Sequence, residues 1–435
     1  MSFQQGLSGL NAASKSLETI GNNVANASTV GFKGSQAQFA DVFANSLTGA
    51  GGSQVGIGTK VGAVVQQFTQ GNITASNNPL DIAINGGGFF RMSNGGTITY
   101  SRNGQFQLDR EGYVVNTSGS RLTGYTADVR GVLSTGAPAE LNIRTTDLAP
   151  QATARVATQL NLDSRSRQLD PADFDVTNPT TYTSSSSVSI FDSLGNPHIF
   201  QMYYINTTTP GEWEVFASLD GVMLPPDDPT NPVPLGTLVF DSDGAIDTAA
   251  TTPALLGITG SEISIDLDDV ATELSTVSGN TVVNSATSPL TFLMNFTGST
   301  QYGAPFGVTR LVQDGYTSGR LSGFVIGTDG MITGRYTNGE SATLGQVVLA
   351  NFTNPNGLQP LGNNVWAESS GSGPALVGPP TSGGLGTLQA SAVEDSNVDL
   401  TAELVNMITA QRVYQANAQT IKTQDQVLQT LVNLR

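Results

Sequence analysis

His198 is the only histidine in the chain, within the segment DSLGNPHIF. A Ser-His-Asp catalytic arrangement would need an activated serine, and no G-x-S-x-G sequence is present to supply it. With one histidine and no cysteine, the sequence also lacks the usual ligand set of a zinc site. The segment therefore predicts a turn that leads into a strand.

Two other patterns resemble binding sites only in part. The run INGGGFF contains Gly86, Gly87 and Gly88, but it fits neither glycine pattern of a phosphate-binding loop, so it predicts a tight turn between strands. The acidic run DSDGAID, residues 241–247, lacks the spacing and the twelfth-position glutamate of a calcium loop and predicts a hairpin turn. The acidic residues 266–269 are interpreted as a solvated edge. No cofactor, metal or catalytic residue is predicted.

The negative charge of the chain is concentrated in its middle. The net charge is −17, and residues 146–289 carry nineteen acidic and only three basic side chains. Such a surface is well solvated and binds nucleic acid poorly. No segment is long and apolar enough to span a bilayer. The N-terminus shows no cleavable secretory signal. We therefore expect neither a nucleic-acid partner nor membrane insertion.

Apolar residues recur at alternating spacings of four and three at both ends of the chain, which predicts amphipathic helices with a heptad seam. The N-terminal seam consists of Phe3, Leu7, Leu10, Leu17 and Val24, with Ser14 and Gly21 as weaker positions. The C-terminal seam consists of Leu400, Leu404, Met407, Tyr414, Ala418, Ile421, Leu428 and Val432, interrupted by Gln411 and Asp425. Ser396 and Asp399 are expected to form a capping box before the last helix, and the first helix is expected to end near Gly31.

The region between the two helices predicts β structure. Three segments place apolar residues on both sides of an Asp/Gly turn, which is typical of hairpins: residues 106–115, 238–246 and 324–332. Because isolated amphipathic helices are marginal in water, each terminal helix is expected to pair with the other as a coiled coil. The predicted fold is thus mixed and mainly β, with long terminal helices and β-rich domains inserted between them.

Three motifs resemble the flagellar rod and hook family. They are ANASTVGFK at 25–33, NNPLDIAINGGGFF at 77–90, and the segment 396–431, which contains AQRVYQAN. The motifs occur in the family's order, at the family's ends of the chain. Rod members have little that is similar to the block 146–289, whereas a large outer domain is characteristic of the hook subunit. The absence of cysteine excludes the cysteine cross-link that some hook proteins make.

The resemblance implies four regions, each named here by its residues. Residues 1–30 with 393–435 would form a helical coiled-coil domain around a central channel. Residues 31–75 with 370–392 would form an extended linking region. Residues 76–145 with 290–369 would form an inner β domain, and residues 146–289 an acidic outer β domain.

The function implied by the resemblance is mechanical. Copies of the chain would assemble into a curved hollow tube, a flexible universal joint that transmits torque from the motor and rod to the filament. The implied partners are the chain itself, the distal rod, the hook cap, the hook–filament junction proteins and the flagellar type III export apparatus. Export without a cleaved signal peptide would place the protein outside the cell, in the hook and basal body.

Other interpretations remain open at this point. The chain could be another axial protein of the rod and hook family, or an exported carbohydrate-binding β protein or enzyme, which a concave pocket with clustered carboxylates or aromatics in 146–289 would favour. Phe39 and Phe43 resemble the Phe-x-x-x-Phe pattern by which early flagellar substrates engage the export gate. The same two residues would equally serve as an apolar packing contact in the tube wall.

Overall fold

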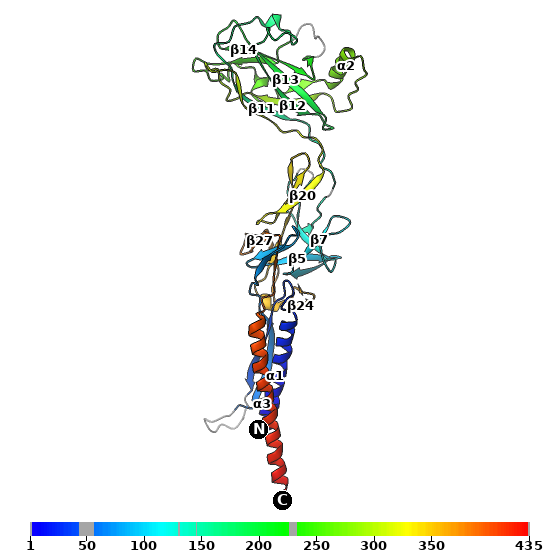
Figure 1. Cartoon of the computed structure of the whole chain (residues 1–435), viewed down its shortest axis with the longest axis vertical. Coiled ribbons are helices and arrows are strands. Elements are labelled where there is room, and N and C mark those ends of the chain that lie inside the picture. Colours follow the sequence, from blue (N-terminus) through cyan, green and yellow to red (C-terminus); the bar gives the residue numbers. More distant parts are fainter. Residues whose placement is uncertain (1, 43–55, 129–130, 145, 226–232, 434–435) are drawn as a thin grey trace. The chain divides into compact units, whose positions relative to one another are not determined.

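The chain divides into two compact units, which are described separately. The computed structural model describes residues 2–42, 56–128, 131–144, 146–225 and 233–433, coloured along the sequence in Figure 1. Unit 1 consists of Met1–Thr145, Ser322–Arg335 and Ser341–Arg435. Unit 2 consists of Thr146–Leu321 and Tyr336–Glu340. Unit 2 is therefore an insertion in unit 1.

Helices stand at both ends of the chain, and the rest is mainly β structure, as predicted. The helices are α1 (Ser2–Ala25), α2 (Leu267–Ser278) and α3 (Leu400–Asn433), with short 3₁₀ turns at Pro171–Asp173, Pro253–Leu255 and Pro355–Gly357. Gly31 has the expected left-handed φ of +70°, but α1 ends before it. After Ala25 the backbone hydrogen bonds tighten to the i→i−3 pattern of turns, because the N–H of Ala27 donates to Val24 and that of Thr29 donates to Asn26.

The acidic side chains at two helix starts act as caps. Asp399 accepts hydrogen bonds from the backbone N–H of Thr401 (2.8 Å) and Ala402 (3.2 Å), so Asp399 takes the capping role that the sequence assigned to Ser396. The acidic residues predicted as a solvated edge at 266–269 are exposed, and they also form the beginning of α2, because the side chain of Asp266 accepts from the N–H of Asp268. In both helices an aspartate side chain satisfies a free backbone N–H of the first turn.

The described residues of unit 1 form a thirteen-stranded sheet and three two-stranded sheets. The large sheet follows the order β20-β21-β22-β9-β5-β6-β25-β24, with β7, β8, β10, β23 and β26 beside it, and the small sheets pair β1 with β2, β4 with β27 and β3 with β28. The strands are β1 (Ser35–Val42), β2 (Gly58–Gln66), β3 (Ile73–Ala75), β4 (Ile82–Asn85), β5 (Phe89–Asn94), β6 (Thr97–Ser101), β7 (Phe106–Leu108), β8 (Val114–Asn116), β9 (Arg121–Thr126), β10 (Ala139–Glu140), β20 (Leu321–Ile326), β21 (Met331–Tyr336), β22 (Ser341–Val347), β23 (Leu349–Asn351), β24 (Gln359–Gly362), β25 (Val365–Ala367), β26 (Leu376–Gly378), β27 (Thr387–Ala390) and β28 (Ala392–Glu394).

Aromatic rings form one core cluster of unit 1. Phe89 contacts both Phe352 and Trp366 edge-to-face, with ring centroids 5.9 and 5.7 Å apart. Tyr100 packs against Phe352 in the same way at 4.7 Å. These residues come from β5, β6, β25 and the end of β23, so the cluster joins segments from both ends of the sequence.

Unit 2 is built from two sheets that share one core. One sheet has the order β17-β18-β11-β19, and the other has β12-β13-β14-β15 with β16 beside β14. The strands are β11 (Arg155–Asn161), β12 (Ser184–Phe191), β13 (Pro197–Asn206), β14 (Glu212–Leu219), β15 (Val222–Met223), β16 (Gly236–Val239), β17 (Ile263–Ile265), β18 (Leu290–Asn295) and β19 (Gly307–Gln313). β11 pairs with β18 in parallel, whereas the pairs β11–β19, β12–β13, β13–β14, β14–β15, β14–β16 and β17–β18 are antiparallel.

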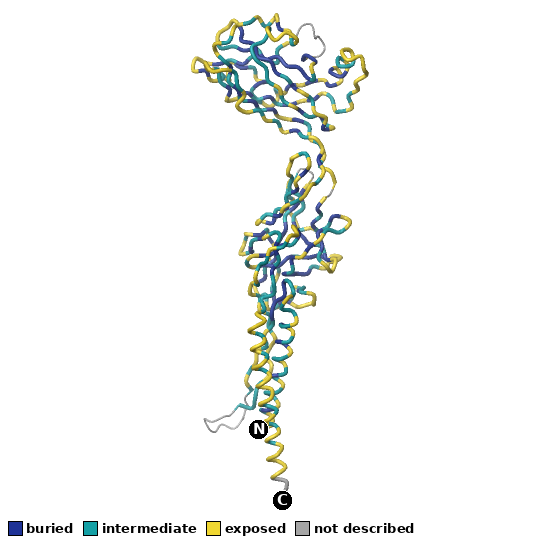
Figure 2. The backbone as a smooth tube through the Cα atoms, viewed as in Figure 1, coloured by how far each residue is buried: buried dark blue, intermediate teal, exposed yellow. Residues whose placement is uncertain are grey.

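The two sheets of unit 2 meet through fully buried side chains. Phe200 of β13 contacts Phe292 of β18 edge-to-face at 5.3 Å, and Trp213 lies in the same cluster with no exposed surface. Figure 2 shows the buried residues concentrated along these strands and the exposed ones along the connecting turns. Tyr203 points to the other face of β13, where Phe174 covers it at 5.3 Å. Packing thus accounts for the aromatic residues that a sugar-binding interpretation would have used.

The three predicted hairpins are present. β7 pairs antiparallel with β8, and Asp109 in their turn accepts from the backbone N–H of Glu111 and Tyr113. Phe240 bridges Ile246 across a turn that Asp241 closes in the same manner. The aspartates predicted as turn residues therefore act as side-chain acceptors for local backbone groups.

The shared core of unit 2 yields a stability prediction. Phe292→Ala should lower the free energy of unfolding of unit 2 by about 3–5 kcal/mol, because a side chain with 1% exposure is lost without replacement. The sequence has two tryptophans, Trp213 in unit 2 and Trp366 in unit 1, so a Trp366→Phe background leaves Trp213 as the reporter. Denaturant unfolding followed by Trp213 fluorescence measures the change. Val283→Ala, at a 74% exposed position, is the control, and an equal loss in both variants would contradict the assigned core.

Candidate functional site

The two terminal helices lie side by side in unit 1, but small residues form their contact. A Cβ atom added at Gly6 would lie 3.0 Å from the side chain of Ile421, and one added at Gly9 would lie 2.7 Å from Asn417. At the other end of α1, the side-chain amide of Asn23 donates to Glu403 at 3.2 Å. α1 therefore approaches α3 through glycines and an asparagine, which a hydrophobic pattern does not reveal.

Half of the described apolar residues of the predicted seams stay exposed in the single chain. Six of them are exposed: Phe3, Leu7, Leu400, Leu404, Tyr414 and Leu428. Six are partly buried: Leu10, Leu17, Val24, Met407, Ala418 and Ile421. Val432 is helical, but its side chain lies outside the described residues. Of the twelve, Ile421 is placed directly against α1, whereas the exposed residues are left for contacts beyond the single chain.

The β1–β2 hairpin covers part of the helices. Residues 35–42 pair antiparallel with 58–66, and the side-chain amide of Gln5 in α1 donates to the carbonyl oxygen of Gly56. Phe39 lies on this hairpin with 43% of its surface exposed. Its predicted partner Phe43 lies outside the described residues, so the Phe-x-x-x-Phe hypothesis stays a prediction.

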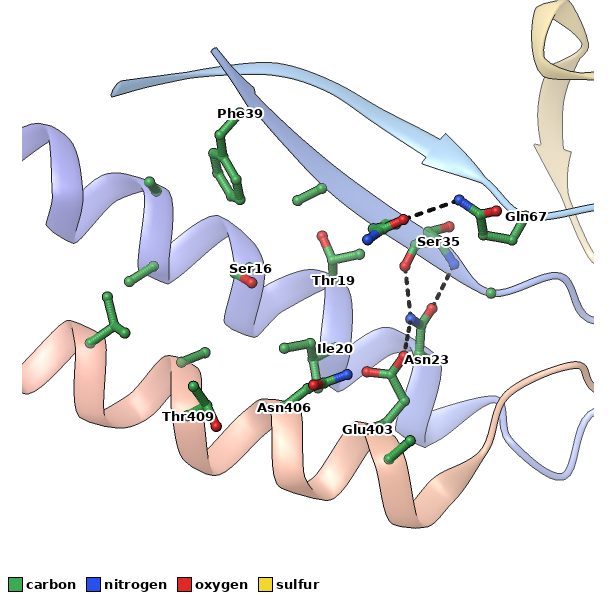
Figure 3. Close-up of a pocket in the computed structure, with 18 of the residues that line it drawn as sticks. Ser16, Thr19, Ile20, Asn23, Ser35, Phe39, Gln67, Glu403, Asn406 and Thr409 are labelled. Carbon is green, nitrogen blue, oxygen red and sulfur yellow. Dashed lines mark hydrogen bonds between the residues drawn. The ribbon is translucent and has the colours of Figure 1, made fainter. Parts of the chain in front are cut away.

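A groove of about 820 Å³ lies between α1, β1 and α3. Figure 3 shows Ile20, Glu403 and Asn406 on the facing helices and Phe39 and Ser35 on the neighbouring strand. Asn23 organises one end of the groove, because its side chain exchanges hydrogen bonds of 2.8 Å with the backbone of Ser35. This pair of hydrogen bonds ties α1 to β1 at that end of the groove.

A buried ionic cluster joins the ends of unit 1. Glu394 accepts a hydrogen bond from Lys33 at 2.6 Å and another from Arg102 at 3.0 Å, and the backbone N–H of Gly71 donates to it at 2.9 Å. The side chains of Lys33 and Glu394 have no exposed surface. Burial lowers the pKa of Lys33, and the adjacent carboxylate of Glu394 partly offsets this effect.

The residues that sequence reasoning considered for chemistry have structural roles. The run Gly86–Gly88 forms the turn after β4, with left-handed φ at Gly86 and Gly88 as the tight-turn prediction requires. Among the described residues, no group of three or more His, Asp or Glu side chains could hold a metal ion. No described helix is long and apolar enough to cross a membrane.

His198 lies between two carboxylates of unit 2. Its Nδ1 is 2.7 Å from Asp220, and its Nε2 is 3.5 Å from Asp192, which is too long for a good hydrogen bond. The hydrogen bond to Asp220 raises the pKa of His198 despite partial burial. Asp192 is occupied by Leu194 and Asn196, from which it accepts hydrogen bonds. His198 therefore joins two turns and faces no described serine nucleophile.

Comparisons with known proteins agree along the whole length of the chain. Four family models match: the flagella basal body rod protein at 3–33, the flagellar hook protein FlgE/F/G D1 domain at 83–167, the flagellar basal body protein FlaE D2 domain at 161–316, and the flagellar basal body rod FlgEFG protein C-terminal region at 389–434. The flagellar hook proteins FlgE of Salmonella typhimurium and Escherichia coli are 41% and 40% identical, and each alignment covers 100% of both chains. The chain belongs to the flagellar hook protein family.

A solved member has a related fold. The crystal structure of the Helicobacter pylori flagellar hook protein FlgE2 covers 74% of this chain and 100% of its own, with a TM-score of 0.50 and 14% identity. At that identity the likeness concerns the fold alone. The family resemblance predicted from the three sequence motifs is confirmed by the full-length relatives.

Sequence reasoning missed the ionic cluster and the polar contact of Asn23. Lys33 stood inside the motif ANASTVGFK, but its partner Glu394 is 361 positions away. A lysine between Phe32 and Gly34, in a chain with only 12% charged residues, was the one available signal. It did not identify the partner.

The ionic cluster predicts that replacing the carboxylate of Glu394 by an amide strongly lowers the stability of unit 1. Glu394→Gln keeps the side-chain shape but leaves Lys33 and Arg102 buried without their carboxylate, so the free energy of unfolding of unit 1 should fall by about 3–5 kcal/mol. Fluorescence of Trp366 in denaturant measures it, in a Trp213→Phe background. Glu18→Gln removes the exposed Lys15–Glu18 pair and should change stability by less than about 1 kcal/mol. Similar values for the two variants would contradict the role of Glu394.

The raised pKa of His198 predicts that the stability of unit 2 falls as the pH rises. Because its folded-state pKa is raised, the stabilisation is complete below the unfolded value of about 6.5 and is lost as pH rises through the folded pKa. Thermal unfolding of unit 2 between pH 6 and pH 9 should therefore show a decline that His198→Gln removes. Asp192, whose carboxylate is held by hydrogen bonds, should contribute in the opposite direction only at acid pH. An unchanged decline in His198→Gln would assign the effect to other groups.

Proposed function

We propose that this chain is the structural subunit of the bacterial flagellar hook, and that copies assemble into a curved hollow tube. The observation that carries the proposal is the match to flagellar hook proteins over 100% of both chains. The large exposed apolar residues on α1 and α3 support self-association, since a chain that functioned alone would gain by burying them. In this role the tube acts as a universal joint that transmits torque from the rod to the filament.

The terminal helices form the polymerising part of the subunit in this proposal. α1 and α3 pair within one chain through small residues, and the apolar positions that remain exposed contact helices of neighbouring copies. In this proposal the coiled-coil packing forms between helices of several copies in the assembled tube, and the seam residues are buried there. The contacts are heterologous, so they can repeat without closing.

The four-region division is part of the same proposal. Residues 1–30 with 393–435 form the helical domain, 31–75 with 370–392 the linking region, 76–145 with 290–369 the inner β domain, and 146–289 the acidic outer domain. The finding of an inserted unit 2 supports a separate outer domain. Its charge favours a position where neighbouring copies are well spaced, because like charges repel within a Debye length of about 10 Å at 0.1 M salt.

The proposed partners follow from the position of the hook. They are other copies of the chain, the distal rod, the hook cap, the hook–filament junction proteins and the flagellar type III export apparatus, with the final location outside the cell and no cleaved signal peptide. Phe39 and Phe43 would engage the export gate, or would pack in the tube wall. Because the family is one of structural proteins, no catalytic activity is proposed.

The alternative of a rod protein is less well supported. The residues 161–316 match a D2 domain model, and the full-length relatives named above are hook proteins rather than rod proteins. An exported sugar-binding protein or enzyme is disfavoured because Trp213, Tyr203 and Tyr204 are at most 3% exposed.

The function is tested by electron microscopy of a strain that lacks the gene. Wild-type chain should restore hooks, whereas Leu404→Asp should not, because it places a charge among apolar residues that copies bury on assembly. Leu404 is 45% exposed in the single chain, so unit 1 should remain folded by circular dichroism. Val277→Asp, at an 81% exposed position of unit 2, is the matched control and should restore hooks. Basal bodies with normal hooks in the untransformed strain would refute the proposal.

A further inference from the structure

We infer that the groove between α1, β1 and α3 receives the free end of α3 from a second copy of the chain. The inference rests on the proposed function and names the partner segment and its register. Three observations support it: the small residues of the groove, its uncompensated carboxylate, and a length of α3 that extends past the described part of α1.

The groove is lined by small side chains at its centre. α1 contributes Gly9, Ala12, Ala13 and Ser16, and α3 contributes Ala402 and Ala410. The whole groove, which Ile20 and Phe39 also line, has a volume of about 820 Å³. Small residues on facing helices leave room for a large apolar side chain from outside, because close packing is favoured wherever it can be reached.

The groove is also acidic. Its described lining includes Asp399 and Glu403 and contains no lysine or arginine. Asp399 caps α3, so its carboxylate is occupied. One oxygen of Glu403 accepts from Asn23 at 3.2 Å, whereas the other is shielded from water and has no hydrogen-bond partner among the described residues. A cation arriving at this end of the groove would compensate Glu403.

The C-terminal part of α3 has the complementary features. Gly6 meets Ile421, and α1 extends four residues further to Ser2, so the last two turns of α3 continue beyond α1, as Figure 1 shows. Lys422 lies just past Ile421 and makes no ion pair with any described residue. Val427 and Leu428 are 48% and 53% exposed on the free length. This segment offers one positive charge followed by large apolar side chains.

One register satisfies both charge and shape. Consider a second copy whose α3 runs parallel to that of the first copy and is displaced along the helix axis. A displacement of nineteen residues, or about 29 Å, places Lys422 of the second copy level with Glu403 of the first. The same shift places Leu428 opposite Thr409, beside Ala410 and the small residues of α1. Because the two contacting surfaces differ, the contact can be repeated by further copies without closing.

Arg412, the other unpaired cation described on α3, does not give an equivalent fit. Setting Arg412 opposite Glu403 would need a shift of nine positions. That shift places Ala418 of the second copy opposite Thr409 of the first. An alanine side chain fills little of the groove between these small residues. The register through Lys422 is therefore the one that uses the whole groove.

Disulfide trapping tests the register directly, because the natural chain has no cysteine. In hooks assembled from Thr409→Cys/Leu428→Cys, mild oxidation should give a ladder of multimers on non-reducing gels. Each single variant can form dimers at most, which makes the two single variants the controls. The pair Ile408→Cys/Val427→Cys has the same offset at positions 53% and 48% exposed, and it replaces the first pair if that pair does not assemble. Hooks in normal number without a ladder from either pair would overturn the docking.

Charge reversal gives an independent measurement. Glu403→Lys should reduce the number of hooks per cell by about tenfold or more, since it faces Lys422, and Glu403→Lys/Lys422→Glu should restore it. Arg412→Glu is the control and should not rescue Glu403→Lys. Rescue by Arg412→Glu alone would also overturn the inference. If the wild-type chain itself forms no hooks in the strain lacking the gene, the proposed function fails; if it forms hooks but neither ladder nor rescue is seen, only the docking fails.

Discussion

Unit 1 depends on a single buried carboxylate. Glu394 is held by Lys33 from the segment after α1, by the backbone of Gly71 and by Arg102 after β6, and it lies just before α3. Arg102 also lies 5.4 Å from the ring of Phe89 and donates to the carbonyl oxygen of Gly86, so the cluster reaches the aromatic core. Removing one partner of such a group leaves uncompensated charge in the interior. The cluster therefore ties the segment after α1 and the segment before α3 to the sheets of unit 1.

Small residues have a second consequence for the helices. Because Gly6 and Gly9 let α1 approach α3 closely, the intramolecular contact does not consume the leucines. A helix pair joined through leucine would be more stable alone and would offer less surface to another copy. The subunit thus combines a close helix contact made through small residues with apolar side chains that stay exposed on the outside of the pair.

The sequence predicts the elements of this structure better than their contacts. Helix period at both ends and Asp/Gly turns in the middle were sufficient for α1, α3 and the three hairpins, because these features are local. The inward face of α1 could not be predicted, since glycines contribute nothing to a hydrophobic pattern. Glu394 could not be paired with Lys33 because 361 positions separate them. The helix α2 was missed for a local reason, because Asp266 was interpreted only as a solvated charge and not as the N-cap of a helix.

The two strands that enter and leave unit 2 lie next to each other. Leu148 bridges Gly319 and Gln151 bridges Tyr316, so the chain departs and returns through one antiparallel pair. The distance between those two points stays the same whatever is folded beyond them. Evolution can consequently lengthen, shorten or replace the inserted region without disturbing the remainder of the subunit, and a foreign domain whose own termini are adjacent could be displayed at the same position.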